Sequence, residues 1–170
     1  MSSNFKVTHK IPVYKGDMVI REDGNIYLLS WNITNHANNQ ATQVTECNSI
    51  FEFTRWFDDE VDEDGFVIQR GGQRIVVPAM PCSHAEYAGR PDYAMNQGNP
   101  GIVADHLITV NLQWNPVTKN LHINDQFVIG DFTYRIVNIS IAEVNIAKEY
   151  GVLTLNAKRV AGGGVADEGV

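Results

Sequence analysis

The chain has 170 residues, 44% of them hydrophobic, and a formal net charge of −7 at pH 7. The hydrophobic fraction excludes wholesale disorder and allows one domain of ordinary size with its own core. The 13 Lys and Arg residues are scattered, so the sequence lacks the clustered positive charge with which nucleic-acid-binding proteins hold phosphates. No apolar run reaches the roughly 18 residues needed to span a membrane, and no membrane association is expected.

The N-terminal residues 1–16 contain neither an apolar core nor a small-residue cleavage site, so we expect no signal peptide. The two cysteines, Cys47 and Cys82, are too few for a disulfide framework. We therefore expect free thiols and a reducing cytoplasm during synthesis.

Strand patterns dominate the first half of the chain. Residues 17–31 contain two apolar runs on either side of Asp23-Gly24, a pair typical of a tight hairpin. Residues 41–57 are rich in β-branched and aromatic residues and partly alternate. Residues 66–80 predict two short strands on either side of Gly71-Gly72.

Strand patterns continue in the second half. Residues 106–115 alternate between polar and apolar side chains, which predicts a half-buried strand with Trp114 on its apolar side. Residues 123–139 predict a hairpin around Gly130-Asp131, and residues 150–160 alternate again. Four side chains of the predicted hairpin are expected to pack in the wall of the fold: Phe127, Ile129, Tyr134 and Ile136.

These roughly eight or nine short strands, separated by turn residues, predict an all-β fold, a small antiparallel β-barrel. At most one short helix is expected, within residues 139–151. The barrel is expected to form a single domain over residues 1–160, with a long loop at residues 82–105 inserted in it. Residues 161–170 are expected to form a flexible Gly-rich tail.

The expected loop, residues 82–105, holds three Gly and two Pro and has little periodicity. Loops of this length are usually functional. Arginine beside tyrosine can stack on bases or anchor a protein interface, and the acidic net charge favours the interface. The candidate contact residues of this loop, which could also obstruct a channel, are Tyr87, Arg90, Asp92, Tyr93 and Asn96.

Residues 58–65 form the densest charge run. Its six carboxylates are Asp58, Asp59, Glu60, Asp62, Glu63 and Asp64. The spacing of Glu60, Asp62, Asp64 and Gly65 is similar to the first half of a calcium loop, but Gly71 stands where the bidentate glutamate should be. We therefore favour an acidic hairpin tip between residues 51–57 and 66–70 over a metal site.

Catalytic and cofactor motifs are absent from the sequence. There is no dinucleotide or phosphate-binding glycine motif, no GxSxG and no HExxH. Cys82 and His84 lack the paired spacing of zinc ligands, although a hydrolase that uses one of them is a distant alternative. We expect no catalytic residue, no metal and no cofactor. Arg135 is interpreted as a barrel arginine whose stem packs and whose head reaches either a carboxylate such as Asp125 or the rim of the barrel.

The order of several short motifs is similar to that of a protein family. Gly16-Asp17 opens the first strand, and Cys47-Asn48 leads into residues 49–53. The later motifs are a run with Asn115, Thr118, Ile123, Asp125 and Phe127, then residues 134–139 and residues 151–159. This order resembles the head-completion proteins of long-tailed phages, also called head-closure proteins or stoppers, over most of residues 16–159.

The resemblance implies a β-barrel protein of the virion neck that assembles in the host cytoplasm as a hexameric or dodecameric ring. The ring would lie below the portal and adaptor proteins and above a tail terminator or tail tube protein. It would close the channel against escaping double-stranded DNA and would give the tail a docking surface. An acidic channel repels phosphate, so DNA would pass without specific binding.

Two alternatives stay open. A tail terminator, or tail-completion protein, is also a β-rich ring. A ligand-binding β-barrel could use its tryptophans, Trp31, Trp56 and Trp114, as stacking faces.

Overall fold

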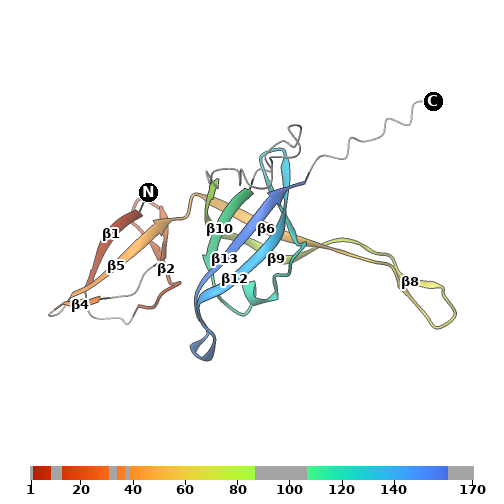
Figure 1. The fold of residues 1–170 in the computed structure, drawn as a ribbon, viewed down its shortest axis with the longest axis horizontal. Helices are drawn as coiled ribbons and strands as arrows, with labels where there is room; N and C mark the ends of the chain where they lie inside the picture. The colour runs from red at the N-terminus through yellow and green to blue at the C-terminus, as the bar shows by residue number, and fades with distance from the viewer. Residues whose placement is uncertain (1, 9–12, 31–33, 37–38, 87–106, 161–170) are drawn as a thin grey trace, which may run out of the picture.

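The computed structural model describes residues 2–8, 13–30, 34–36, 39–86 and 107–160. In this part of the chain the secondary structure is almost entirely strand, and it forms an N-terminal sheet, a central barrel and a hairpin that projects from the barrel (Figure 1). None of the helices in the described ranges is long and apolar enough to cross a membrane.

Six antiparallel strands close into a barrel, in the order β10-β13-β12-β11-β6-β9. The predicted small antiparallel β-barrel is therefore confirmed. Two short 3₁₀ turns, η1 (Thr118–Asn120) and η2 (Ile146–Lys148), lie in the connections. The barrel strands are β6 (Ser49–Phe57), β9 (Gly72–Glu86), β10 (Leu107–Gln113), β11 (Gln126–Ile129), β12 (Phe132–Asn145) and β13 (Tyr150–Arg159).

The barrel core follows the alternation of the sequence. The apolar side chains of β10 point inward, and an aromatic group fills the space between β6, β11 and β12. The ring of Phe127 lies 4.8 Å from that of Phe51 and 5.2 Å from that of Phe53, measured between centroids. Phe127, Tyr134 and Ile136 are buried and Ile129 packs against them, which confirms the four wall residues predicted for this hairpin.

The contact between β6 and β11 is the shortest seam of the barrel. These strands share one ladder pair, Thr54 with Gln126, whereas β12 and β13 pair over most of their length. The Thr54 hydroxyl adds a hydrogen bond of 3.3 Å to the carbonyl of Gln126. Closure of the barrel therefore depends at this seam on side chains as well as on the ladder.

The N-terminal strands form a separate five-stranded sheet in the order β1-β5-β3-β2, with β4 also paired to β5. Its strands are β1 (Ser2–Thr8), β2 (Met18–Ile20), β3 (Ile26–Leu29), β4 (Thr34–His36) and β5 (Asn39–Glu46). It has its own small core of Tyr27, Leu29 and Val44. The expectation that residues 1–160 build one barrel is therefore corrected, although the hairpin at Asp23-Gly24 is present between β2 and β3.

Next to the N-terminal sheet, the backbone at Gly16 packs directly against the barrel backbone at Gly151. A Cβ atom added to Gly16, whose φ is +91°, would lie 2.0 Å from the carbonyl oxygen of Gly151 at the start of β13. The rings of Tyr14 and Tyr150 lie 5.0 Å apart beside this point, and Lys15 forms an ion pair with Glu143. Only glycine allows so close an approach.

One further expectation needs correction, and one is confirmed. Residues 82–86 are not loop, because they continue β9, and residues 83–86 pair with β10; the remainder of the expected loop, residues 87–105, lies outside the described residues. Within residues 139–151 the single turn η2 confirms the expectation of at most one short helix, and β12 continues through the residues before it to Asn145. The expected tail, residues 161–170, also lies outside the described part.

Candidate functional site: a projecting arm

The outer parts of β6 and β9 continue past the barrel wall as a long two-stranded hairpin (Figure 1). We call residues 55–75 the arm. Its shaft pairs Trp56 with Gln73 and Phe57 with Gly72. Its tip is the short hairpin of β7 (Glu60–Val61) and β8 (Val67–Gln69). The acidic run therefore lies in a hairpin between the two predicted strands.

Two of the six carboxylates shape the arm. The side chain of Asp62 accepts hydrogen bonds from the amides of Asp64 and Phe66, at 3.0 and 2.8 Å, and closes the turn in which Gly65 has a φ of +84°. Asp59 accepts a hydrogen bond from the amide of Gly71, which lies between β8 and β9 on the other side of the hairpin. Aspartate commonly stabilises turns in this way.

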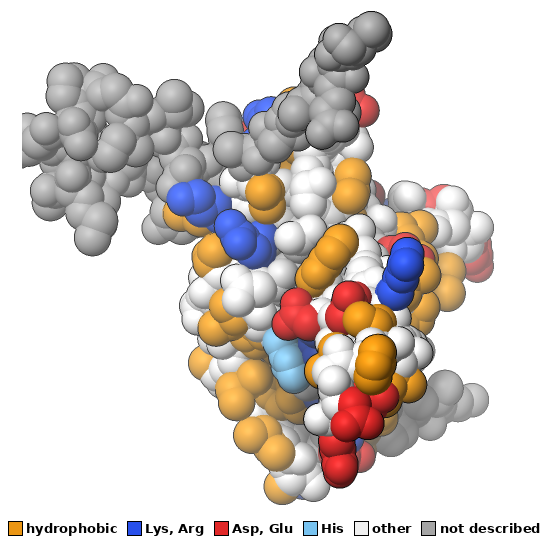
Figure 2. Space-filling model, turned by 90° about the vertical axis from the view of Figure 1, so that its right-hand side faces the viewer, with side chains coloured by type: hydrophobic (Ala, Val, Ile, Leu, Met, Phe, Trp, Pro, Cys, Tyr) orange, Lys and Arg blue, Asp and Glu red, His pale blue; other side chains and the backbone are white. Residues whose placement is uncertain are grey.

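The other four carboxylates, Asp58, Glu60, Glu63 and Asp64, are exposed. None of them takes part in an ion pair formed within the described residues. In that same part of the chain, no group of three His, Cys, Asp or Glu side chains is arranged to hold a metal ion. The arm therefore presents free negative charge at its tip, as Figure 2 shows for the side of the molecule from which the arm projects.

The arm also exposes large apolar side chains. Every residue from 58 to 70 is exposed. The apolar members of the arm with more than half of their surface exposed are Trp56 (70%), Val61 (53%), Phe66 (72%), Val67 (51%), Ile68 (67%) and Ile75 (58%). A two-stranded hairpin has no second layer to cover such side chains, and clustered exposed apolar residues commonly mark an interaction surface.

An ion pair fixes the base of the arm to the barrel. The guanidinium of Arg55 donates from Nε and Nη2 to the two carboxylate oxygens of Asp125, at 2.6 and 2.9 Å, and from Nη2 to the carbonyl of Asn120 at 2.7 Å. Asp125 is 1% exposed and also accepts a hydrogen bond from the amide of His122. The carboxylate, through its hydrogen bond, raises the pKa of Arg55.

This geometry excludes Asp125 as the partner of Arg135. Asp125 pairs with Arg55 of β6, not with Arg135, which is exposed on β12 opposite Lys158. Arg55 was missed as a partner because it lies 70 residues from Asp125. A signal was nevertheless present: Phe51, Phe53 and Arg55 share one side of an alternating strand, so a charge follows two core positions.

The thiol of Cys82 is unsuited to nucleophilic catalysis. It is fully buried and donates a weak hydrogen bond to the carbonyl of Ser49 at 3.6 Å. Burial, and secondarily the nearby Cys47, raises the pKa of Cys82 to about 12. Burial also raises the pKa of Cys47 to about 11. Since the thiolate is the reactive form, both groups stay protonated near neutral pH.

His84 forms a hydrogen bond that the sequence did not predict. Its Nδ1 lies 2.8 Å from the hydroxyl of Ser49, and its backbone exchanges two hydrogen bonds with the Asn48 side chain. A catalytic Ser–His pair needs a third group to orient the imidazole, and no described carboxylate bonds to this ring. The contacts hold the beginning of β6 against β9.

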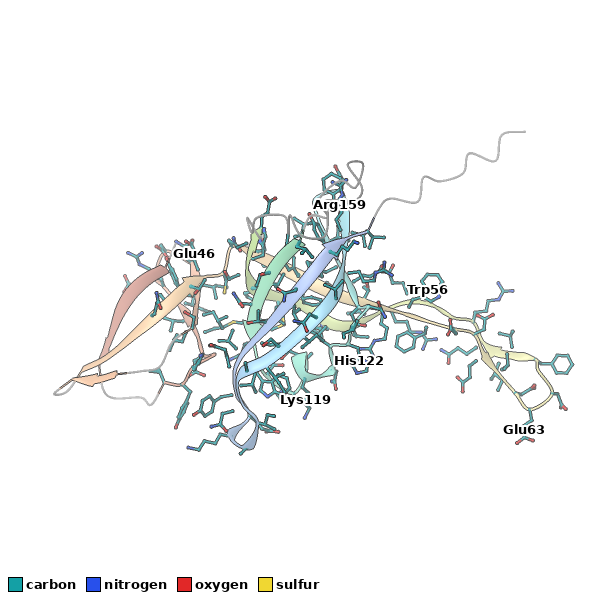
Figure 3. The ribbon with its side chains drawn as sticks, viewed as in Figure 1. Glu46, Trp56, Glu63, Lys119, His122 and Arg159 are labelled. Atoms are coloured by element: carbon teal, nitrogen blue, oxygen red, sulfur yellow. The ribbon has the colours of Figure 1, made fainter. Side chains whose placement is uncertain are left out.

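The remaining sequence candidates divide into two groups. Five of them, Tyr87, Arg90, Asp92, Tyr93 and Asn96, lie outside the described residues. Among the tryptophans, Trp56 stands on the arm (Figure 3), and Trp114 packs against the barrel core, so these two do not share a stacking face. Trp31 lies outside the described residues.

Comparison with models of protein families, with curated proteins and with solved structures found no match to this chain.

Proposed function

We propose that the protein is a structural component of the phage virion, in the connector between head and tail. In this proposal it forms a homo-oligomeric ring below the portal or adaptor protein, closes the DNA channel and gives the tail a docking surface. The observation that best supports it is the arm, whose exposed apolar side chains and acidic tip have nothing in the described chain to cover them. An arm of this kind suits a protein that acts through assembly.

The barrel supports the same proposal by its construction. A closed sheet has no free edge strands at which other chains could pair unspecifically. The Arg55–Asp125 ion pair ties the projecting strand to the barrel, so a force on the arm reaches a packed core. A rigid frame that holds extended contacts for its neighbours is what a ring between head and tail requires.

The acidic character of the chain is also compatible with a channel for DNA. Exposed carboxylates repel phosphate, so DNA passes a surface of this kind without adhering. The net charge of −7 includes the six carboxylates of residues 58–64.

The test is electron microscopy of a lysate from a phage in which an early stop codon interrupts this gene. Emptied heads beside complete free tails are expected for a head-closure protein. Filled heads beside tails of abnormal length would assign the protein to tail termination instead. Whole particles of normal appearance would contradict both assignments.

A further inference from the structure

The charges of this molecule are separated between two places. The tip of the arm carries four free carboxylates, and no described cation neutralises them within the chain. In Figure 3 the labelled Glu63 lies at the far end of the arm, whereas Arg159 lies at the barrel, at the end of β13. The tip of an arm therefore does not reach this part of its own barrel.

Strand register gathers positive charge at that end of the barrel. Arg135 of β12 lies directly opposite Lys158 of β13, and Arg159 follows opposite Tyr134. The guanidinium of Arg159 lies 3.3 Å from the centroid of the Phe132 ring, which holds it at the barrel rim. We call Val128, Phe132, Arg135, Lys158 and Arg159 the basic end.

Arg135 is exposed and forms no ion pair or hydrogen bond within the described residues. The basic end also exposes apolar surface, since Phe132 is 44% and Val128 57% exposed. It therefore combines cations with apolar side chains, as the arm combines carboxylates with apolar side chains.

We infer that the arm of one copy docks on the basic end of a second copy. The carboxylates of Glu60, Glu63 and Asp64 meet Arg135, Lys158 and Arg159, and the apolar side chains of the two surfaces cover each other. Charge complementarity of this kind selects the partner and fixes the register of an interface. A nucleic acid is not the partner of the arm, because the acidic tip repels it.

The contact joins two different surfaces, so each copy can give one arm and receive another. A heterologous contact of this type produces a closed ring when the rotation between copies closes, and a filament when it does not. The inference deepens the proposed function, because it identifies the contact that would build the ring. It is tested with the purified protein alone, so its failure is distinguishable from a failure of the phage assignment.

The experiment is sedimentation velocity of the full chain over a series of concentrations, at low and high ionic strength. The arm variant is Glu60→Lys, Glu63→Lys, Asp64→Lys, which leaves Asp59 and Asp62 to shape the turn. The wild-type protein is expected to form oligomers that weaken as salt screens the charges. The arm variant is expected to associate at least about tenfold more weakly.

The second variant, the end variant, is Arg135→Glu, Lys158→Glu. Its matched control is Lys119→Glu, Lys148→Glu, which makes the same change of charge at exposed positions of η1 and η2. The end variant is expected to lose association by the same factor, at least about tenfold, whereas the control is expected to associate as the wild type does.

The decisive sample is an equimolar mixture of the arm variant and the end variant. Each has two surfaces of like charge and cannot pair with itself, but each arm in the mixture finds an opposite charge on the other variant. Restored association would show that both variants are folded and that arms dock in trans. A monomeric wild type at every concentration, an end variant that associates like the control, or a mixture that stays dissociated would overturn the inference.

Discussion

The Arg55–Asp125 ion pair gives the sharpest test of how the barrel is closed. Arg55→Met keeps most of the aliphatic stem but removes the charge and the hydrogen bonds to Asp125 and to the carbonyl of Asn120. The carboxylate that remains is 1% exposed and keeps only the amide of His122 as a described donor. Breaking a buried ion pair on one side commonly costs about 3–5 kcal/mol.

The lower end of that range applies here. The side chain of Arg55 is 24% exposed, so water reaches part of the site and can solvate the abandoned carboxylate. We therefore expect a loss of about 3 kcal/mol in the free energy of unfolding, a large part of the roughly 5–15 kcal/mol typical of a domain. Urea unfolding followed by tryptophan fluorescence measures the loss as a lower midpoint at an unchanged slope.

Two further variants separate the buried charge from the lost contacts. Arg135→Met removes an exposed arginine of the same barrel and is expected to change the free energy of unfolding by less than about 0.5 kcal/mol. Adding Asp125→Asn to Arg55→Met removes the unpaired charge and is expected to recover part of the loss. An Arg55→Met protein as stable as the Arg135→Met control would refute the argument that this pair secures the seam.

Four other predictions concern the joint, the buried thiol and the arm. Gly16→Ala should lower the thermal midpoint more than Gly24→Ala, since both glycines have positive φ but only the Cβ at position 16 meets backbone; equal shifts would contradict the tight joint. The pKa of Cys82 is about 12 in the folded protein, so the unfolded thiol ionises first and stability should fall as pH rises above about 9, an effect reduced in Cys82→Ala. Cys82 should also resist dithionitrobenzoate at pH 8 until urea unfolds the chain, and fast labelling of the native protein would contradict its burial. Replacing residues 58–71 by an Asn-Gly turn should leave the thermal midpoint of the barrel nearly unchanged, and a chain that no longer folds would show that the arm belongs to the folding unit.

The barrel could be predicted from the sequence because its strands obey a period of two. In β10 the apolar positions Ile108, Val110 and Leu112 are all buried, and the turn at Gly130-Asp131 sets the register of β11 and β12. Local rules suffice where one face of a strand is buried and the next strand follows directly.

Which strands share a sheet could not be predicted in the same way. The strands before residue 47 show the same apolar runs as the barrel strands, yet they form a second sheet with a small core of its own. The joint between the two parts depends on Gly16 and Gly151, which lie far apart in the sequence and have no pattern in common. Periodicity reports that a side chain is buried, but not against which sheet it packs.

The sequence does contain a residue that indicates where the arm leaves the barrel, and that residue is Arg55. Arg55 lies on the same, inward-facing side of β6 as Phe51 and Phe53. A guanidinium in that place costs free energy of folding unless a carboxylate of the barrel pairs with it. Asp125, from a turn far along the chain, meets this need and is buried as a result. Beyond this pair β6 has no further core to face, so its next side chains are exposed and the strand continues as an arm. Arg55, a charged residue where the alternation of β6 would place a core residue, therefore helps to close the barrel. It also marks the start of the surface that we assign to assembly.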